Sequence, residues 1–80
     1  MSYAATAFPH NIRFLRAVKG ITQGELAKQA GISEKSVHLY EAGAVEPSLG
    51  TAGKIAEVLG VTPNDLMDVG YVEDKRKLLA

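Results

Sequence analysis

The chain has 80 residues, with nine basic and nine acidic side chains, two histidines and no cysteine. This length fits one small domain with a single hydrophobic core, and the absence of cysteine excludes disulfides, thiolate metal sites and a cysteine nucleophile. No apolar run approaches the roughly 20 residues that a membrane span needs, and the first residues lack a secretory signal, so we expect a soluble cytoplasmic protein without membrane contact.

The charges sum to zero but are unevenly distributed. Residues 1–40 carry five basic and two acidic side chains, whereas residues 41–80 carry four basic and seven acidic ones. A balanced total is unusual for a protein that binds nucleic acid, because a basic surface is expected there. The asymmetry between the halves nevertheless favours the first half as an end that faces nucleic acid.

Helical periodicity indicates an all-α fold. Apolar residues recur at i, i+3 and i+4 between glycines and prolines, and no segment alternates long enough to favour a sheet. The first helix is expected over residues 9–19, because Pro9 suits a first-turn position and Gly20 follows as a stop signal. Ile12 and Leu15 mark its buried face.

Two short helices with a glycine-containing turn between them are expected next. Thr22 and Glu25 have the spacing of a capping box, so a second helix starts there and stops at Gly31. Ser33 is the expected N-cap of a third helix, which Gly43 ends. The second helix is expected to bury Leu26, Ala27 and Ala30.

Two more helices are expected in the second half of the chain. Ser48 is the expected cap of a fourth helix that ends at Gly60. Thr62, followed by Pro63 in the first helical position, starts a short fifth helix. The expected core stripe of the fourth helix consists of Leu49, Ala52, Ile55, Ala56 and Leu59.

The expected helices divide the chain into three parts. Residues 1–8 form an N-terminal extension that can be disordered, residues 9–69 form the folded domain, and residues 70–80 form a C-terminal tail. The tail combines Tyr71 and Val72 with a charged run, so it either frays or docks on a second copy or another partner.

An ordered set of residues resembles a known family. The set consists of Thr22, Gln23, Glu25, Leu26, Ala27, Gly31, Ile32, Ser33, Val37, Tyr40, Glu41, Gly43, Pro47, Ser48, Ala56, Leu59, Gly60, Val61 and Leu66. It resembles the lambda repressor/Cro-like (xenobiotic-response-element-type) helix-turn-helix family of DNA-binding transcriptional regulators, over about residues 10–68. The resemblance implies a compact five-helix domain with the helix-turn-helix at helices two and three.

The resemblance also implies roles for individual residues. The helix over residues 33–42 is the implied recognition helix in the major groove, with helix two lying across the DNA backbone. Gln23 matches a phosphate contact, which fits the free amides and positive dipole end of a helix N-terminus. Arg16 and Glu41 match an ion pair between helices one and three, which is structural rather than a DNA contact. Further expected phosphate contacts are Thr22, Ser33 and Ser36.

A helical wheel of the third helix separates an inner from an outer arc. At 100° per residue, the arc opposite Val37 and Tyr40 faces outward. Lys35 can donate to guanine or phosphate, Glu34 can accept from cytosine, and Leu39 can contact a thymine methyl group. The alternatives are a solvated helix face and, for Leu39, a wider apolar stripe. The expected base or groove contacts are Glu34, Lys35, His38 and Leu39.

The loop after the third helix departs from the family pattern. Many relatives carry basic residues there that reach phosphates, whereas this chain has Ala44, Val45 and Glu46. We therefore expect one subunit to bind weakly and two subunits to act together. Several apolar residues outside the predicted core either form a dimer or partner surface or are ordinary scattered exposed residues, namely Phe14, Val18, Val45, Tyr71 and Val72.

Two functions stay open at this point. One is a sequence-specific regulator, a repressor that binds a pseudo-palindromic operator of double-stranded DNA as a homodimer, with half-sites roughly 34 Å apart. The other is a protein-interaction module of the same fold with little DNA binding, which the neutral charge favours. The chain lacks a nucleophile motif, a phosphate-cradling glycine loop and metal-ligand spacing, and its only histidines are His10 and His38. We therefore expect no enzyme activity, no cofactor and no metal.

Overall fold

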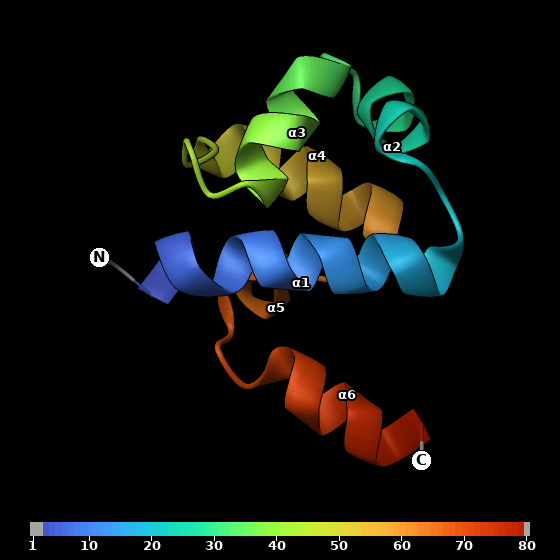
Figure 1. The fold of residues 1–80 in the computed structure, drawn as a ribbon, viewed down its shortest axis with the longest axis vertical. Coiled ribbons are helices and arrows are strands. Elements are labelled where there is room, and N and C mark those ends of the chain that lie inside the picture. Colours follow the sequence, from blue (N-terminus) through green and yellow to red (C-terminus); the bar gives the residue numbers. More distant parts are fainter. Residues whose placement is uncertain (1–2, 80) are drawn as a thin grey trace.

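Six α-helices make up the computed structural model, which describes residues 3–79 (Figure 1). They are α1 (Tyr3–Lys19), α2 (Gln23–Ala30), α3 (Glu34–Glu41), α4 (Leu49–Leu59), α5 (Pro63–Met67) and α6 (Tyr71–Leu79). Helix α1 crosses the middle of the molecule, with α2, α3 and α4 on one side and α6 on the other. The described residues contain no strand, which confirms the all-α prediction. None of these helices is long and apolar enough to cross a bilayer.

The corner between α2 and α3 forms from local signals. The Thr22 hydroxyl accepts from the Glu25 N–H at 3.0 Å, and the Glu25 carboxylate accepts from the Thr22 N–H at 3.0 Å, as the capping box predicted. Gly31 closes α2 with a φ of 72°, a left-handed conformation that suits glycine. Ser33 then caps α3 by accepting from the Ser36 N–H. A three-residue connection therefore sets the angle between the two helices.

The second half of the chain uses the same signals. The Ser48 hydroxyl accepts from the Thr51 N–H at the start of α4. Thr62 and Asp65 form a second capping box, with Pro63 in the first helical position of α5. The predicted starts of α4 and α5 are both confirmed.

The predicted start of α1 is wrong. The helix begins at Tyr3 instead of Pro9, which lies inside it and is buried. A proline within a helix removes one backbone hydrogen bond, and burial of Ala7 and Phe8 compensates for that loss. The predicted extension over residues 1–8 therefore falls largely in α1, and residues 1–2 lie outside the described part of the chain.

The prediction is also wrong for one residue of the core stripe of α4. Leu49 is 81% exposed, whereas the other four members of the stripe are buried. Leu49 is the first residue of the helix and Gly50 beside it is exposed, so the first turn of α4 projects past the core. The helical spacing was correct, but no other helix covers this end.

The tail forms a sixth helix that the five-helix prediction did not include. Tyr71 and Val72 at its start are buried, so α6 is fastened to the rest of the molecule near Gly70. Its later residues are mostly exposed, and Leu78 is 77% exposed. Arg76 and Glu73 form an exposed ion pair one turn apart, which contributes little to stability.

A buried asparagine joins α1 to the end of α5. Asn11 is 1% exposed, and its side-chain N–H groups are directed at the carbonyl oxygens of Asp65, Leu66 and Asp68, at 3.2, 2.9 and 2.9 Å. Carbonyl groups at a helix C-terminus lack partners within the helix, so Asn11 acts as a cap supplied by another helix. No local sequence pattern indicates this role.

Candidate nucleic-acid interface

Helix α3 is held by one face and exposes the other. Val37 is fully buried and Glu41 is 4% exposed, so both anchor the helix to the core. Tyr40 packs edge-on against Phe8 of α1, with the ring centroids 6.0 Å apart. The opposite arc carries the exposed side chains of Glu34, Lys35 and His38, and the half-buried Leu39. Three of the four residues predicted to contact bases thus lie in solvent on one face.

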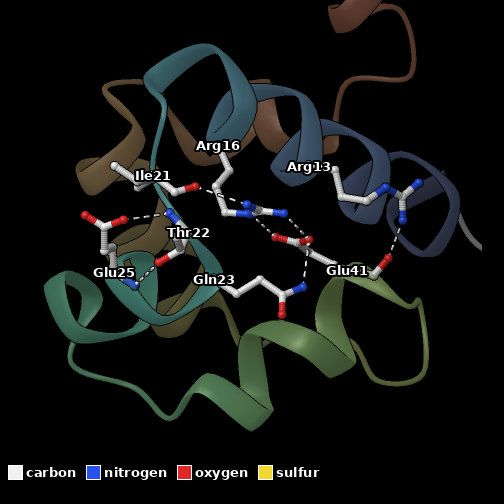
Figure 2. A network of polar contacts seen from close by, with 7 residues as sticks. All are labelled: Arg13, Arg16, Ile21, Thr22, Gln23, Glu25 and Glu41. Atoms are coloured by element: carbon white, nitrogen blue, oxygen red, sulfur yellow. Dashed lines mark hydrogen bonds and ion pairs between the residues drawn. The ribbon is translucent and has the colours of Figure 1, made fainter.

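The Glu41 carboxylate is the centre of a network that joins three helices (Figure 2). Arg16 of α1 donates to both of its oxygens, from Nε at 2.8 Å and from Nη2 at 3.1 Å. Gln23 of α2 donates to Oε1 at 3.0 Å, and Arg16 also donates to the carbonyl of Ile21. The expected ion pair is therefore present, and it fixes α3 relative to α1 and α2.

The electrostatics of this pair follow from its burial. Hydrogen bonds to Glu41 raise the pKa of Arg16 above its ordinary value, although partial burial of the guanidinium acts in the opposite direction. A buried carboxylate is tolerated only when it is paired and hydrogen-bonded. Arg16 therefore neutralises Glu41, and its charge is not available to a nucleic acid.

Gln23, the predicted phosphate contact, lies half-buried at the start of α2. One of its amide hydrogens is used by Glu41, which leaves the second for another acceptor. The Thr22 hydroxyl takes the Glu25 N–H, and within residues 3–79 the N–H groups of Gln23 and Gly24 have no acceptor. The start of α2 thus presents free hydrogen-bond donors beside α3.

The three hydroxyls predicted to contact phosphates all serve as helix caps or lie beside one. Thr22 and Ser33 accept main-chain hydrogen bonds, and the Ser33 and Ser36 hydroxyls lie 2.9 Å apart. A hydroxyl that accepts a hydrogen bond can still donate its own hydrogen. The Thr22 hydroxyl can therefore still donate a hydrogen bond. Because the Ser33 and Ser36 hydroxyls bond to each other, only one of these two can donate to another group.

Glu34 lies closer to α2 than the helical wheel indicated. A Cβ atom built on Gly24 would lie 2.9 Å from the Glu34 carboxylate oxygen, so this carboxylate sits over the first turn of α2. A negative charge is favourable at a helix N-terminus, and a DNA phosphate is attracted to the same position. The Glu34 carboxylate therefore lies next to the position predicted for a phosphate.

Arg13 is a feature of the interface that sequence analysis missed. It is exposed on α1 and donates through Nη1 to the main-chain carbonyl of Glu41 at the end of α3 (Figure 2). The spacing of Arg13 and Arg16 along one helix was the available signal, since residues three apart lie on neighbouring positions of one face.

The loop after α3 carries apolar side chains instead of cations. Val45 is 46% exposed, and Leu49 at the start of α4 is more exposed still. This loop contains no Lys or Arg, so it brings no positive charge to the C-terminal end of α3. Positive charge near α3 must come from other elements.

A separate apolar groove lies between α1, α6 and the end of α4. Its volume is about 300 Å³, and its lining includes Phe14, Val18, Leu59, Val61, Tyr71 and Leu78. Val18 and Leu78 are 61% and 77% exposed. The groove adjoins α6, on the side of α1 that faces away from α3 (Figure 1). It is thus separate from the exposed face of α3.

The chain is similar to proteins of known family. A family model described as helix-turn-helix, HTH_3, matches residues 12–66, which is more than half of the chain. An uncharacterized HTH-type transcriptional regulator of Methanocaldococcus jannaschii is 37% identical over 57 residues, which cover 71% of this chain and 86% of that protein. An uncharacterized HTH-type transcriptional regulator of Archaeoglobus fulgidus is 44% identical over 55 residues, 69% of this chain and 79% of that protein.

A bacterial relative extends the comparison. A prophage-derived uncharacterized HTH-type transcriptional regulator of Bacillus subtilis is 33% identical over 60 residues, which cover 75% of this chain and 56% of that protein. No solved structure gives a significant match. The family match spans α2, α3 and α4 completely, the second half of α1 and all but the last residue of α5.

Proposed function

Because the chain belongs to the Cro/C1-type helix-turn-helix family HTH_3, whose members are non-enzymatic DNA-binding transcription regulators, we propose that it is a repressor that binds a pseudo-palindromic operator as a homodimer. Helix α3 enters the major groove, and α2 lies across the DNA backbone. Double-stranded DNA is thus its partner, and it works in the cytoplasm.

The observation that carries this proposal is the anchoring of α3. Glu41 is held by Arg16 and Gln23, so the helix is fixed from its inner side while its outer face stays free. A rigid helix with polar side chains in solvent supports base recognition, because contacts to base edges need defined positions. We assign Lys35, Glu34 and Leu39 to the bases, with His38 beside them.

The phosphate contacts are assigned to the ends of α2 and α3. The free N–H groups of Gln23 and Gly24 form one contact. The Thr22 hydroxyl and one hydroxyl of the Ser33 and Ser36 pair supply the others. Phosphate contacts position the protein, so these residues set the register of α3 in the groove.

The homodimer is proposed to form at the apolar groove between α1 and α6. Acidic residues Glu73 and Asp74 occupy the first turn of α6, and basic residues Arg76 and Lys77 occupy its last turn. Two copies of α6 that pack antiparallel about a two-fold axis bring the acidic turn of each against the basic turn of the other. This self-complementary charge pattern favours a second copy of the chain as the occupant.

The small size of α6 means that the proposed interface needs a second helix. A helix of nine residues is about 13 Å long, and a stable interface buries roughly 800 Å² of each partner. Helix α6 alone is too small for that area, so the proposed interface includes Phe14 and Val18 of α1. Because this groove faces away from α3, the pairing leaves both recognition helices uncovered.

A protein-interaction module without DNA binding is the second candidate. Two observations favour it, the exposed Val45 and Leu49 beside α3 and the Glu34 carboxylate over the start of α2. Apolar side chains at that position suit a protein partner, and the carboxylate repels a phosphate.

Selection of duplexes from a random DNA library by the purified full chain separates the two functions. The repressor proposal predicts enrichment of an inverted repeat by the wild-type protein and no enrichment by Lys35→Ala, because Lys35 faces the bases. Lys54→Ala is the matched control, since Lys54 is an exposed lysine of α4 outside this interface. A library that stays random with wild-type protein would overturn the proposal and favour the protein-interaction module.

A further inference from the structure

A small hollow opens where α1, α2 and α3 meet. Its volume is about 210 Å³, and it is lined by Arg13, Gln23, His38, Glu41 and Ala42. Figure 2 shows three of these residues, Arg13, Gln23 and Glu41, which come from three different helices. Gln23 and His38 belong to the proposed DNA-facing surface, so the hollow lies at the edge of that surface.

Arg13 gives the hollow a positive charge that no carboxylate of the described residues pairs with. The Glu41 carboxylate accepts hydrogen bonds from Arg16 and Gln23, so its charge is already balanced by Arg16. Arg13 donates to the main-chain carbonyl of Glu41, which has no net charge. Among the described side chains, no carboxylate lies within ion-pair distance of the Arg13 guanidinium.

The donors around the hollow suit an oxyanion. A guanidinium has five N–H groups in a planar fork that matches phosphate, and Arg13 uses one of its nitrogens on the carbonyl. That hydrogen bond also holds the long side chain in place, so less conformational entropy is lost when an anion binds. Gln23 contributes its second amide hydrogen from the α2 side, and the His38 ring lines the α3 side.

We infer that this hollow binds one phosphate of the DNA backbone, with Arg13 as its cation and Gln23 and His38 as further donors. The inference rests on the proposed function, and it moves His38 from the bases to the backbone. Arg13 then supplies, from α1, a positive charge that the loop after α3 lacks. The base contacts of α3 are left to Lys35, Glu34 and Leu39.

The salt dependence of DNA binding tests this inference. The wild-type chain and Arg13→Gln are titrated by fluorescence anisotropy against the selected operator and a scrambled duplex of equal length, at several salt concentrations. Each phosphate contact makes the slope of log K against log salt about 0.9 more negative, so Arg13→Gln is expected to make the slope less negative by about that amount. Its affinity for both duplexes should fall by the same factor, because phosphates are common to all sequences.

Two further variants separate a lost contact from a lost charge or a damaged fold. Lys19→Gln removes an equal charge from an exposed position of the same helix outside the hollow, and it is expected to keep the wild-type slope. Arg13→Lys keeps the charge and is expected to restore most of the slope. His38→Ala is expected to weaken both duplexes equally, with unchanged base preference.

These experiments distinguish failure of the phosphate site from failure of the proposed repressor function. A wild-type chain that binds the operator, with Arg13→Gln and Lys19→Gln giving equal slopes, overturns the inference and leaves the repressor intact. An altered base preference in His38→Ala overturns the backbone role of His38. A wild-type chain that binds no duplex overturns the repressor and the inference together.

Discussion

Glu41 and Arg16 form a two-point ion pair in which the Glu41 side chain is 4% exposed and the Arg16 side chain is 24% exposed, with the closest atoms 2.8 Å apart. The two partners therefore differ in how well each tolerates the loss of the other. Arg16 reaches water and can stay charged alone, whereas Glu41 cannot be hydrated where it lies. Because Glu41 belongs to α3, the same ion pair both stabilises the domain and holds α3 in position.

Removing the arginine should therefore harm the fold more than removing the carboxylate. Arg16→Met leaves a buried unpaired carboxylate and is expected to cost about 3–5 kcal/mol of unfolding free energy, whereas Glu41→Gln costs less. In the double variant the loss should be smaller than the sum of the two. Urea denaturation of the four proteins measures these values, and additive losses would show that the pair does not act as a unit.

The capping box at the start of α2 predicts a dependence of stability on pH. Hydrogen bonds from the main chain and side chain of Thr22 lower the pKa of Glu25 below its ordinary value. A group whose pKa is lowered by folding stabilises the protein at pH values above its unfolded pKa, and this contribution is lost as pH falls through the folded pKa.

The urea midpoint should therefore decrease as the pH is lowered through and below the ordinary pKa of glutamate, and Glu25→Gln should remove part of that decrease. Glu57→Gln, at an exposed position of α4, is the control for losing a carboxylate elsewhere. Identical pH profiles for wild type and Glu25→Gln would contradict the role of the box.

Glu34 is expected to weaken DNA binding in general while it contributes to specificity. Its carboxylate lies over Gly24 at the start of α2, where it opposes an incoming phosphate. Glu34→Gln should bind a scrambled duplex several-fold more tightly and relax the base preference at one operator position. Anisotropy titrations check this, again with Glu57→Gln as the charge control. An equal gain in both variants would mean that only total charge matters.

The proposed dimer depends on the apolar groove beside α6. Leu78→Asp places a charge in that groove and is expected to shift the protein from dimer to monomer in sedimentation equilibrium. Leu49→Asp is the matched control, because Leu49 is equally exposed but lies outside the groove. A wild-type chain that sediments as a monomer, or a Leu78→Asp variant that remains dimeric, would contradict the proposed interface.

Local signals made the helix starts predictable from the sequence. The caps at Thr22, Ser33, Ser48 and Thr62 involve residues three apart, so their chemistry is complete within one turn of chain. The inner face of α3 was predictable for a similar reason, since helical geometry alone separates Val37 from Lys35.

The features that sequence analysis missed depend on contacts between distant segments. Asn11 caps α5 across more than 50 residues of chain, and no local pattern indicates that the two helices meet. Pro9 lies within a helix because Phe8 is buried against Tyr40, which outweighs the local tendency of proline to start helices. The prediction that Leu49 is buried was wrong for a related reason. Its position fits the apolar stripe of α4, but no other described residue covers it.

The candidate site also combines features that the sequence predicts with features that only the structure shows. The exposed residues of α3 followed from a wheel, whereas the position of Glu34 over Gly24 and the approach of Arg13 to Glu41 required the packed helices. A resemblance carried the pairing of Arg16 with Glu41, which is 25 residues away in the chain.

The ratio of two dissociation constants tests the central claim, that this chain reads DNA sequence through α3. Wild-type protein is titrated at one fixed salt concentration against the selected inverted repeat and against a scrambled duplex of equal length. We predict that the operator binds at least about a thousandfold more tightly than the scrambled duplex, and that Lys35→Ala lowers this preference while Lys54→Ala leaves it unchanged. A ratio near one for the wild-type chain would contradict it.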